Sequence, residues 1–155
     1  MKKAYILVVD DEETIRETIR IILEENGYKV DTAKNGVEAI EKSKRNYYDV
    51  ALLDIKLPDI EGTKLLTKMK DTVPKMVKIM VTGYASMENA IKALNYGADA
   101  YITKPVSPDE LLKVIDEKLR AKREAEVLTE EKVAKWIETR ASKIEGEMSE
   151  NKGKP

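Results

Sequence analysis

The chain has 155 residues, a formal net charge of −1 and neither cysteine nor histidine. Its length suits one domain with a modest appendage, and its balanced charge gives no reason to expect nucleic acid or an anionic membrane as the main partner. The missing cysteine excludes disulfides and thiolate metal sites, and the missing histidine excludes a histidine kinase or a histidine phosphotransfer module. No run of residues is apolar enough to span a bilayer, so we expect a cytoplasmic protein without a membrane partner.

Strand-like and helix-like segments alternate over about the first 120 residues. The short aliphatic runs are typical of strands buried on both faces of a parallel sheet. The segments between them are amphipathic, and together they predict an α/β fold with a doubly wound five-stranded parallel sheet and helices on both faces. We expect strands at Ala4–Val9, Lys29–Ala33, Val50–Asp54, Lys78–Thr82 and Ala100–Thr103. We expect a first helix that carries Ile15 to Leu23 and stops at Gly27, and further helices at Gly36–Lys44, Gly62–Asp71 and Ser86–Tyr96, the last with Met87, Ala90, Ile91 and Leu94 packed in the core.

The fifth helix has a clear start signal. Ser107 can cap it, Pro108 suits the first helical position, and Glu110 completes a capping box. The apolar pattern changes after Leu119, and Thr129 is a candidate start for a sixth, C-terminal helix. The apolar stripe of that helix is Val133, Trp136, Ile137, Ile144 and Met148. The pattern predicts a main domain over 1–122, a helical extension over 123–148 and a disordered tail over 149–155.

Polar residues follow the predicted strands at the points where the strands end. Asp10 and Asp11 follow the first strand, and Asp54 ends the third. Ligands bind at the carboxyl ends of the strands in such folds, so the three carboxylates are expected to converge and to require a divalent cation. Thr82 and Lys104 add a hydroxyl and an ammonium group at the same edge. The set indicates a magnesium-assisted phosphate site with an aspartate as the acceptor.

Four motifs at these strand ends resemble those of the receiver domains of two-component response regulators. The resemblance covers about the first 120 residues, and its motifs occur in order. It implies the strand order 2-1-3-4-5 of a flavodoxin-like sheet. The motifs are Val8–Glu12, Leu53–Pro58 with Gly62, Val81–Tyr84 and Ala100–Pro105.

The resemblance implies a role for each residue of the acidic site. Asp54 would be the phosphoacceptor and would take a phosphoryl group from a sensor histidine kinase. Asp11 and Asp54 would bind Mg²⁺ together with the backbone carbonyl of Lys56, and Asp10 would act through a bound water. Lys104 would pair with the phosphoryl group, through a cis peptide bond to Pro105.

The resemblance also implies a switch and two protein-binding surfaces. Thr82 would move toward the phosphoryl oxygens, which lets the ring of Tyr101 turn inward. This change would alter the surface made by the fourth helix, fifth strand and fifth helix, roughly Ser86–Leu119, which would bind a downstream protein or a second copy. The kinase would dock near the first helix, around Thr14, Ile15 and Thr18. Lys56 and Tyr84 lie where the family varies.

Three other interpretations of the site remain open at this stage. Each polar residue alone could be a solvated turn residue, a strand-end hydroxyl or a surface lysine. The chain could be a receiver-fold scaffold that binds proteins independently of phosphorylation. It could also be a magnesium-dependent aspartyl phosphohydrolase, although such an enzyme usually needs a second carboxylate two residues after the nucleophile, where this chain has Lys56. The resemblance favours a signalling phosphoacceptor that assists only its own phosphorylation and dephosphorylation.

The segment after Arg120 has eight lysine or arginine residues and eight glutamates. It is too short for most independent output domains, and its balanced charge argues against a DNA-binding output. The stripe of the C-terminal helix could bind a partner or a second copy, with Trp136 as the anchor. It could instead fold back on the main domain, or the chain could be part of a longer regulator.

Overall fold

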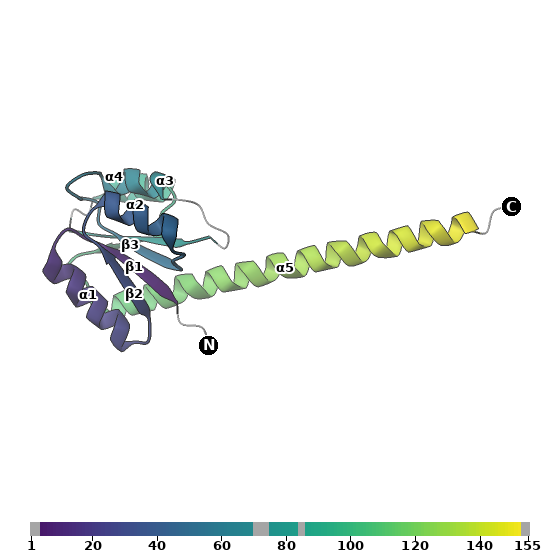
Figure 1. Cartoon of the computed structure of the whole chain (residues 1–155), viewed down its shortest axis with the longest axis horizontal. Coiled ribbons are helices and arrows are strands. Elements are labelled where there is room, and N and C mark those ends of the chain that lie inside the picture. Colours follow the sequence, from purple (N-terminus) through teal and green to yellow (C-terminus); the bar gives the residue numbers. More distant parts are fainter. Residues whose placement is uncertain (1–3, 70–74, 84–85, 153–155) are drawn as a thin grey trace. The chain divides into compact units, whose positions relative to one another are not determined.

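The computed structural model describes residues 4–69, 75–83 and 86–152 of the chain, with residues 147–152 described by their backbone alone. Strands and helices alternate throughout this part (Figure 1). The strands are β1 (Tyr5–Val9), β2 (Lys29–Ala33), β3 (Val50–Leu53), β4 (Val77–Thr82) and β5 (Ala100–Thr103). The helices are α1 (Glu13–Glu25), α2 (Gly36–Arg45), α3 (Gly62–Lys68), α4 (Met87–Asn95) and α5 (Pro108–Lys152). The predicted end of α3 at Asp71 lies outside the described residues.

The five strands form one parallel sheet in the order β2-β1-β3-β4-β5. The flavodoxin-like fold and the strand order expected from the sequence are therefore confirmed. A helix connects each strand to the next parallel strand, so the carboxyl ends of all the strands lie at the same edge of the sheet. This edge carries the residues that follow β1, β3, β4 and β5.

Two hydrophobic cores lie on opposite faces of the sheet, because the aliphatic side chains of each strand alternate between the faces. Helices α2, α3 and α4 cover one face, and α1 and the first turns of α5 cover the other (Figure 1). The first core contains Leu7, Val9, Leu53, Leu65 and Met80. The second contains Ile6, Val8, Leu23, Ile79 and Leu111.

The helix ends follow the signals in the sequence. Gly27 and Gly97 have φ angles of +88° and +102° and end α1 and α4 in a backbone conformation that favours glycine. Asn35 and Ser86 cap α2 and α4, since their side-chain oxygens accept hydrogen bonds from backbone N–H groups of the first turn. These signals set where each helix enters and leaves the sheet layers. Among the described residues, none of the helices is both long enough and apolar enough to cross a membrane.

The apolar face of α4 differs from the prediction. Met87, Ile91 and Leu94 were expected to pack in the core, but their side chains are 80%, 53% and 53% exposed. Ala93 is the buried residue of the helix, because this short helix needs only small side chains to approach the sheet. The periodic pattern gave the helix correctly but could not show which of its faces meets the sheet.

The C-terminal segment also differs from the prediction. A single helix, α5, continues from Pro108 to Lys152, so Thr129 does not begin a sixth helix. The Thr129 hydroxyl instead donates a hydrogen bond to the carbonyl of Ala125 within α5 (2.9 Å). The segment between Arg120 and Thr129 is rich in Ala, Arg, Lys and Glu, which favour helix and leave nothing to interrupt it. The helix includes Ser149–Lys152, for which disorder was expected, while residues 153–155 lie outside the described part. The contacts divide the chain into two units, residues 1–120 and 121–155.

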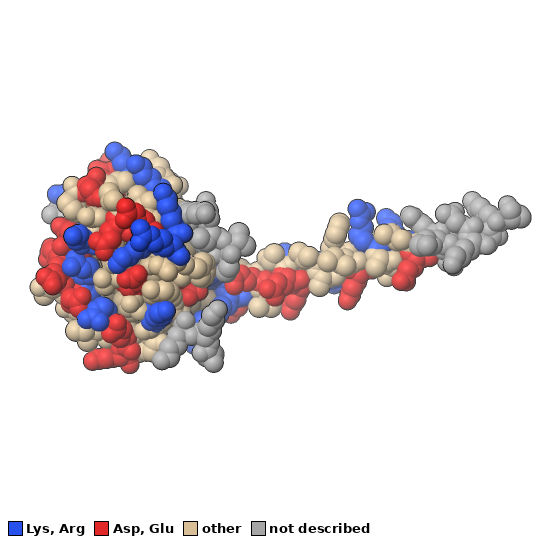
Figure 2. Space-filling model, in the orientation of Figure 1, with Lys and Arg blue, Asp and Glu red and all other residues tan. Residues whose placement is uncertain are grey.

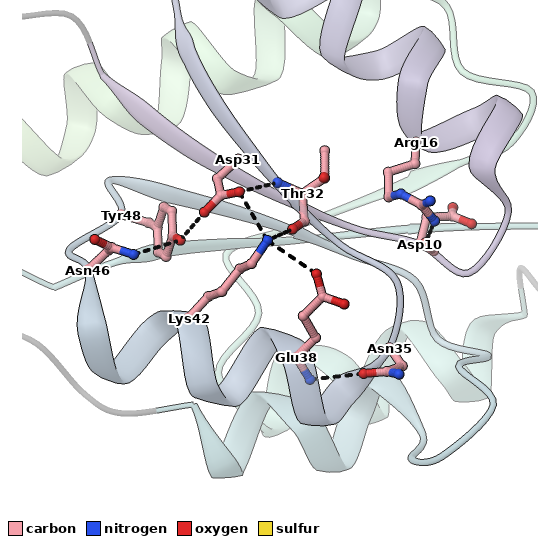
Figure 3. A network of polar contacts seen from close by, with 9 residues as sticks. All are labelled: Asp10, Arg16, Asp31, Thr32, Asn35, Glu38, Lys42, Asn46 and Tyr48. Carbon is pink, nitrogen blue, oxygen red and sulfur yellow. Dashed lines mark hydrogen bonds and ion pairs between the residues drawn. The ribbon is translucent and has the colours of Figure 1, made fainter.

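A polar network ties β2 to α2 on one side of the first core (Figure 3). The hydroxyl of Tyr48, which is 1% exposed, donates to Asp31 at 2.6 Å, and the Lys42 ammonium donates to the other Asp31 carboxylate oxygen at 3.1 Å. Lys42 also pairs with Glu38 at 3.1 Å. Burial alone would raise the pKa of Asp31, but the hydrogen bonds from Tyr48, Lys42 and the Thr32 backbone lower it.

Tyr48→Phe is expected to destabilise the protein by about 1–2 kcal/mol at neutral pH, because it removes a donor from a partly buried carboxylate. The lowered pKa of Asp31 contributes stability that is present at neutral pH and lost as the pH falls through its native value. The cost of the substitution should therefore shrink in acid, below the ordinary aspartate pKa of about 4. Urea unfolding at both pH values measures this, with Tyr96→Phe, an exposed tyrosine on the surface, as the control. An equal cost at both pH values would contradict the account.

Candidate functional site

The backbone of the sheet continues past the strand ends and fixes the polar residues there. The N–H of Asp10 donates to the carbonyl of Ala33 on β2 (3.1 Å), and the N–H of Asp54 donates to the carbonyl of Val9 on β1 (3.1 Å). The N–H of Lys104 donates to the carbonyl of Thr82 on β4 (2.9 Å). Because these bonds extend the parallel ladders, Asp10, Asp54 and Lys104 have little backbone freedom.

Lys104 lies between two buried carboxylates. Its Nζ atom is 2.7 Å from Oδ2 of Asp10 and 3.1 Å from Oδ2 of Asp54. The carboxyl side chains are only 4% and 7% exposed, and that of Lys104 is 15% exposed. Residues from three separate strands thus form one charged cluster, as the sequence predicted for this edge. The peptide bond between Lys104 and Pro105 is cis, as the resemblance implied.

The remaining oxygens of these carboxylates accept backbone hydrogen bonds. Oδ1 of Asp10 accepts from the N–H of Glu12 (2.9 Å), and Oδ1 of Asp54 accepts from the N–H of Lys56 (3.3 Å). Both side chains are therefore held in fixed orientations at the ends of their strands. A fixed carboxylate can react without the cost of reorganisation.

Burial controls the electrostatics of the cluster. Burial raises the pKa of Asp54, and the hydrogen bond and charge of Lys104 oppose this while the charge of Asp10 adds to it. Burial alone would lower the pKa of Lys104, but the hydrogen bonds and charges of Asp10 and Asp54 raise it. Lys104 therefore stays protonated, and the Asp54 carboxylate is less stabilised than one in water. The pocket favours a further positive charge.

The cluster opens to solvent through a cleft of about 500 Å³. Its lining combines acidic and basic side chains with the small surface of a glycine, which leaves room for a compact anion next to Asp54. The lining residues are Asp11, Glu12, Asp54, Lys56, Gly83 and Lys104. Asp54 is thus both buried in the cluster and accessible from the cleft.

Three carboxylates could together hold a metal ion. Asp10, Asp11 and Asp54 each offer one oxygen, and these oxygens lie within 4.8 Å of one another. Asp10 and Asp54 are buried, and Asp11 is exposed. Carboxylate oxygens around a partly open position suit a hard cation such as Mg²⁺, which keeps several of its waters. The sequence prediction that these three residues converge is correct.

Thr82 and Tyr101 lie near the site in different environments. The Thr82 side chain is completely buried, and Thr82 is not among the described residues that line the cleft. Tyr101 is half-buried and packs against the first core. Burial raises the pKa of the Tyr101 phenol, and a hydrogen bond with the backbone of Ser86 opposes this. Tyr84 lies outside the described residues.

Two contacts between remote segments were missed in the sequence, and that of Arg16 supports the site. The guanidinium group of Arg16 on α1 donates to the backbone carbonyl of Asp10 at 2.8 Å, and the two lie side by side in Figure 3. The carboxylate of Asp59, in the loop after β3, accepts hydrogen bonds from the N–H groups of Gly36 and Val37 at the start of α2 (both 2.9 Å). These bonds join segments that are remote in the sequence, and no local pattern reveals them.

Gly62 lets α3 begin directly against the acceptor loop. Its N–H donates to the carbonyl of Ile55 (2.6 Å), and a Cβ atom at this position would lie 2.1 Å from the backbone oxygen of Asp54. Such a contact cannot be relieved by rotating a side chain, because the atom it meets belongs to the backbone. Only glycine fits here without moving Asp54.

Gly62→Ala is expected to destabilise the protein by about 1–3 kcal/mol, the usual cost of overpacking, and to slow any reaction at Asp54. Gly83→Ala is the control, because a Cβ atom there would meet no other atom within 4 Å. Thermal unfolding of both variants measures the difference. Equal stability of the two would show that the Asp54 backbone is not held as tightly as its contacts indicate.

Comparison with known proteins gives one consistent family. Residues 6–116 match the model of the response regulator receiver domain. The chain is 35% identical over 120 residues to the transcriptional regulatory protein YkoG of Bacillus subtilis, a match that covers 77% of this chain and 53% of YkoG. It is 38% identical over 106 residues to the alginate biosynthesis transcriptional regulatory protein AlgB of Pseudomonas syringae, with coverage of 68% and 24%. The chain thus matches about half, or less, of the length of these relatives.

The solved structures agree with this match. A receiver domain protein described as CheY-like from Methanospirillum hungatei is 48% identical, has a TM-score of 0.76, and is matched over 80% of this chain and 99% of its own. The sheet order, the acidic cluster and the lysine at the end of β5 all lie within the matched region. The chain therefore belongs to the family of response regulator receiver domains.

Proposed function

We propose that this chain is a phosphoacceptor that takes a phosphoryl group from a sensor histidine kinase onto Asp54 in a Mg²⁺-dependent reaction. The observation that carries the proposal is the position of Lys104, which bridges Asp10 and Asp54 beside an open cleft. We assign this role to residues 1–122 and treat 123–148 as a helical extension. The chain is thus a signalling protein that assists only its own phosphorylation and dephosphorylation.

The transfer forms one bond and breaks one. A carboxylate oxygen of Asp54 bonds to the phosphorus atom while the bond between phosphorus and the donor histidine nitrogen breaks. The product is an acyl phosphate on Asp54, and the imidazole leaves with the electron pair of the broken bond. Lys104 neutralises charge on the phosphoryl oxygens, since its ammonium already lies 3.1 Å from the acceptor carboxylate.

The residues around the cleft suit a magnesium ion. Asp11, Asp54 and the backbone carbonyl of Lys56 would bind it directly, and Asp10 would bind it through a water. When bound, the ion supplies positive charge that offsets the repulsion between the carboxylates and the phosphoryl group. The convergence of three carboxylate oxygens within 4.8 Å, against one lysine, supports this assignment.

Phosphorylation changes a surface that a partner protein recognises. Thr82 turns toward the new phosphoryl oxygens, and Tyr101 moves inward into the space that this leaves. The affected surface is α4, β5 and the first turns of α5, and it binds a downstream protein or a second copy. The exposure of Met87, Ile91 and Leu94 on α4 supports this role, because apolar side chains gathered on a surface mark a contact site.

The kinase docks near the start of α1, around Thr14, Ile15 and Thr18. Thr14 and Thr18 are exposed there, and Ile15 is half-buried between them. An exposed pair of small polar residues around an apolar one can accept a partner helix without leaving a charge unpaired.

The test is the mass of the intact protein after incubation with a small acyl phosphate donor. In Mg²⁺ we expect a gain of one phosphoryl group per chain, and with a chelator in place of Mg²⁺ we expect none. The absence of a gain in Mg²⁺ would overturn the proposal. An equal gain with the chelator would overturn the assigned role of the metal.

A further inference from the structure

The extension carries apolar side chains that nothing among the described residues covers. Within residues 121–146, Val127, Val133, Ile137 and Ile144 are each 51–55% exposed. A helix of polar composition gains most of its stability by packing an apolar face, so this stripe indicates an unfilled contact. The neighbouring side chains are mostly charged, and two further exposed apolar residues of the helix, Leu128 and Trp136, lie outside this band.

Three residues of the stripe, Val127, Ile137 and Ile144, follow a seven-residue repeat, and Val133 lies on its flank at position g. If Val127 occupies the first core position, called a, then Ala134, Ala141 and Met148 occupy the same position in later repeats. The second core position, called d, holds Glu130, Ile137 and Ile144. Apolar residues at a and d form the seam between the helices of a coiled coil. The repeat fails only at Glu130, near its start.

The two flanks of this seam carry different charges. The flank that follows each d residue, position e, holds Glu131, Glu138 and Glu145. The opposite flank, position g, holds Val133, Arg140 and Glu147, and Lys143 lies beside Arg140. The guanidinium group of Arg140 lies 5.1 Å from the centre of the Trp136 ring. Figure 2 shows acidic side chains along one edge of this part of the helix and a cluster of basic ones at one place on the opposite edge.

This difference between the flanks favours one relative orientation of two paired helices. Two parallel copies place the e position of each helix against the g position of the other, so Arg140 meets Glu145 of the second copy twice in a symmetric pair. Two antiparallel copies place e against e along one side of the seam, which sets glutamate against glutamate there. Only Glu126 against Glu131 is unfavourable in the parallel arrangement, at the end where Glu130 also weakens the core.

We propose that residues 127–148 form a parallel two-stranded coiled coil with a second copy of this chain. The seam joins Ile137 to Ile137 and Ile144 to Ile144, while the alanines at position a let the helices approach closely. The repeat covers only 127–147 and Met148, so the pairing is reversible and depends on concentration. The inference stands on the helix alone and does not require phosphorylation of Asp54.

Sedimentation of the full, unphosphorylated chain over a range of concentrations tests the pairing. The average mass should rise from that of the 17.6 kDa monomer toward twice that value. Ile137→Glu should raise the dissociation constant about tenfold or more, because it puts unpaired carboxylates in the seam. Leu128→Glu is the matched control, because Leu128 is 56% exposed, close to the 55% of Ile137, and lies off the seam at position b. A chain that stays monomeric, or equal effects of the two variants, would overturn the proposal.

Cross-linking tests the orientation, and the absence of natural cysteines makes it simple. Ile137→Cys and Ile144→Cys should each form a disulfide-linked dimer on mild oxidation, and Leu128→Cys should not. In an antiparallel pair, at most one of the two positions, 137 or 144, lies opposite the same position of the second copy. Cross-linking at only one position, or at neither, would overturn the parallel arrangement.

Discussion

Asp54→Asn is expected to abolish phosphoryl uptake, because the asparagine amide has no carboxylate oxygen that can form an acyl phosphate. The intact mass should stay unchanged after incubation with Mg²⁺ and a small acyl phosphate. Asp59→Asn is the matched control, since Asp59 lies in the same loop but its carboxylate is bound to the start of α2. The control should take up one phosphoryl group as the native chain does. Uptake by the Asp54 variant would place the acceptor elsewhere.

The same substitution should raise the thermal stability of the metal-free protein at neutral pH. Burial and the Asp10 charge raise the native pKa of Asp54 above its ordinary value, so the ionised side chain works against folding above that pH range. Protonation relieves this as the pH falls through the raised pKa, and the gain from asparagine should then disappear. Thermal unfolding near neutral pH and in acid measures both effects. A variant less stable than the native chain at neutral pH would show that the pairing with Lys104 outweighs burial.

Lys104→Met is expected to be the most destabilising change in the site, at roughly 3 kcal/mol, because it leaves two buried carboxylates without their cation. The figure lies at the low end of the range for buried pairs, since Lys104 retains 15% exposure. A second substitution, Asp10→Asn, should recover part of the loss by removing the repulsion between Asp10 and Asp54. Urea unfolding of the single and double variants measures both the loss of stability and its partial recovery.

Lys92→Met is the control for this prediction. Lys92 pairs with Glu61 at 3.7 Å, but both side chains are about half exposed, and such surface pairs contribute little. The control should therefore change stability by less than about 1 kcal/mol. Similar losses for Lys92→Met and Lys104→Met would contradict the view that burial gives the site its electrostatic character.

The sheet and the main site could be predicted because each depends on short local signals. Aliphatic runs fix the strands, and the polar residue after each run must lie at the common carboxyl edge. Asp10, Asp54 and Lys104 therefore meet where the sequence places them. Gly27 and Gly97 end their helices for an equally local reason, the positive φ angle.

The features that could not be predicted depend on contacts between remote segments. The pattern of α4 gives a helix, but which face meets the sheet depends on the space left by β4 and β5. The hydrogen bonds of Arg16 to Asp10 and of Asp59 to α2 depend on how the loops are folded. We expected a break in α5 because the apolar periodicity stops after Leu119. The helix continues there because the residues after Arg120 favour helix even without packing.

The most direct test of the account is to locate the phosphoryl group on the chain. After reaction with Mg²⁺ and a small acyl phosphate, the protein is treated with a hydride reducing agent, digested and examined by tandem mass spectrometry. Reduction converts an aspartyl phosphate into homoserine and so marks the acceptor permanently. We predict a single mark, at Asp54. A mark at Asp10, Asp11 or Asp59 with none at Asp54, or phosphate on a serine or threonine only, would contradict the account.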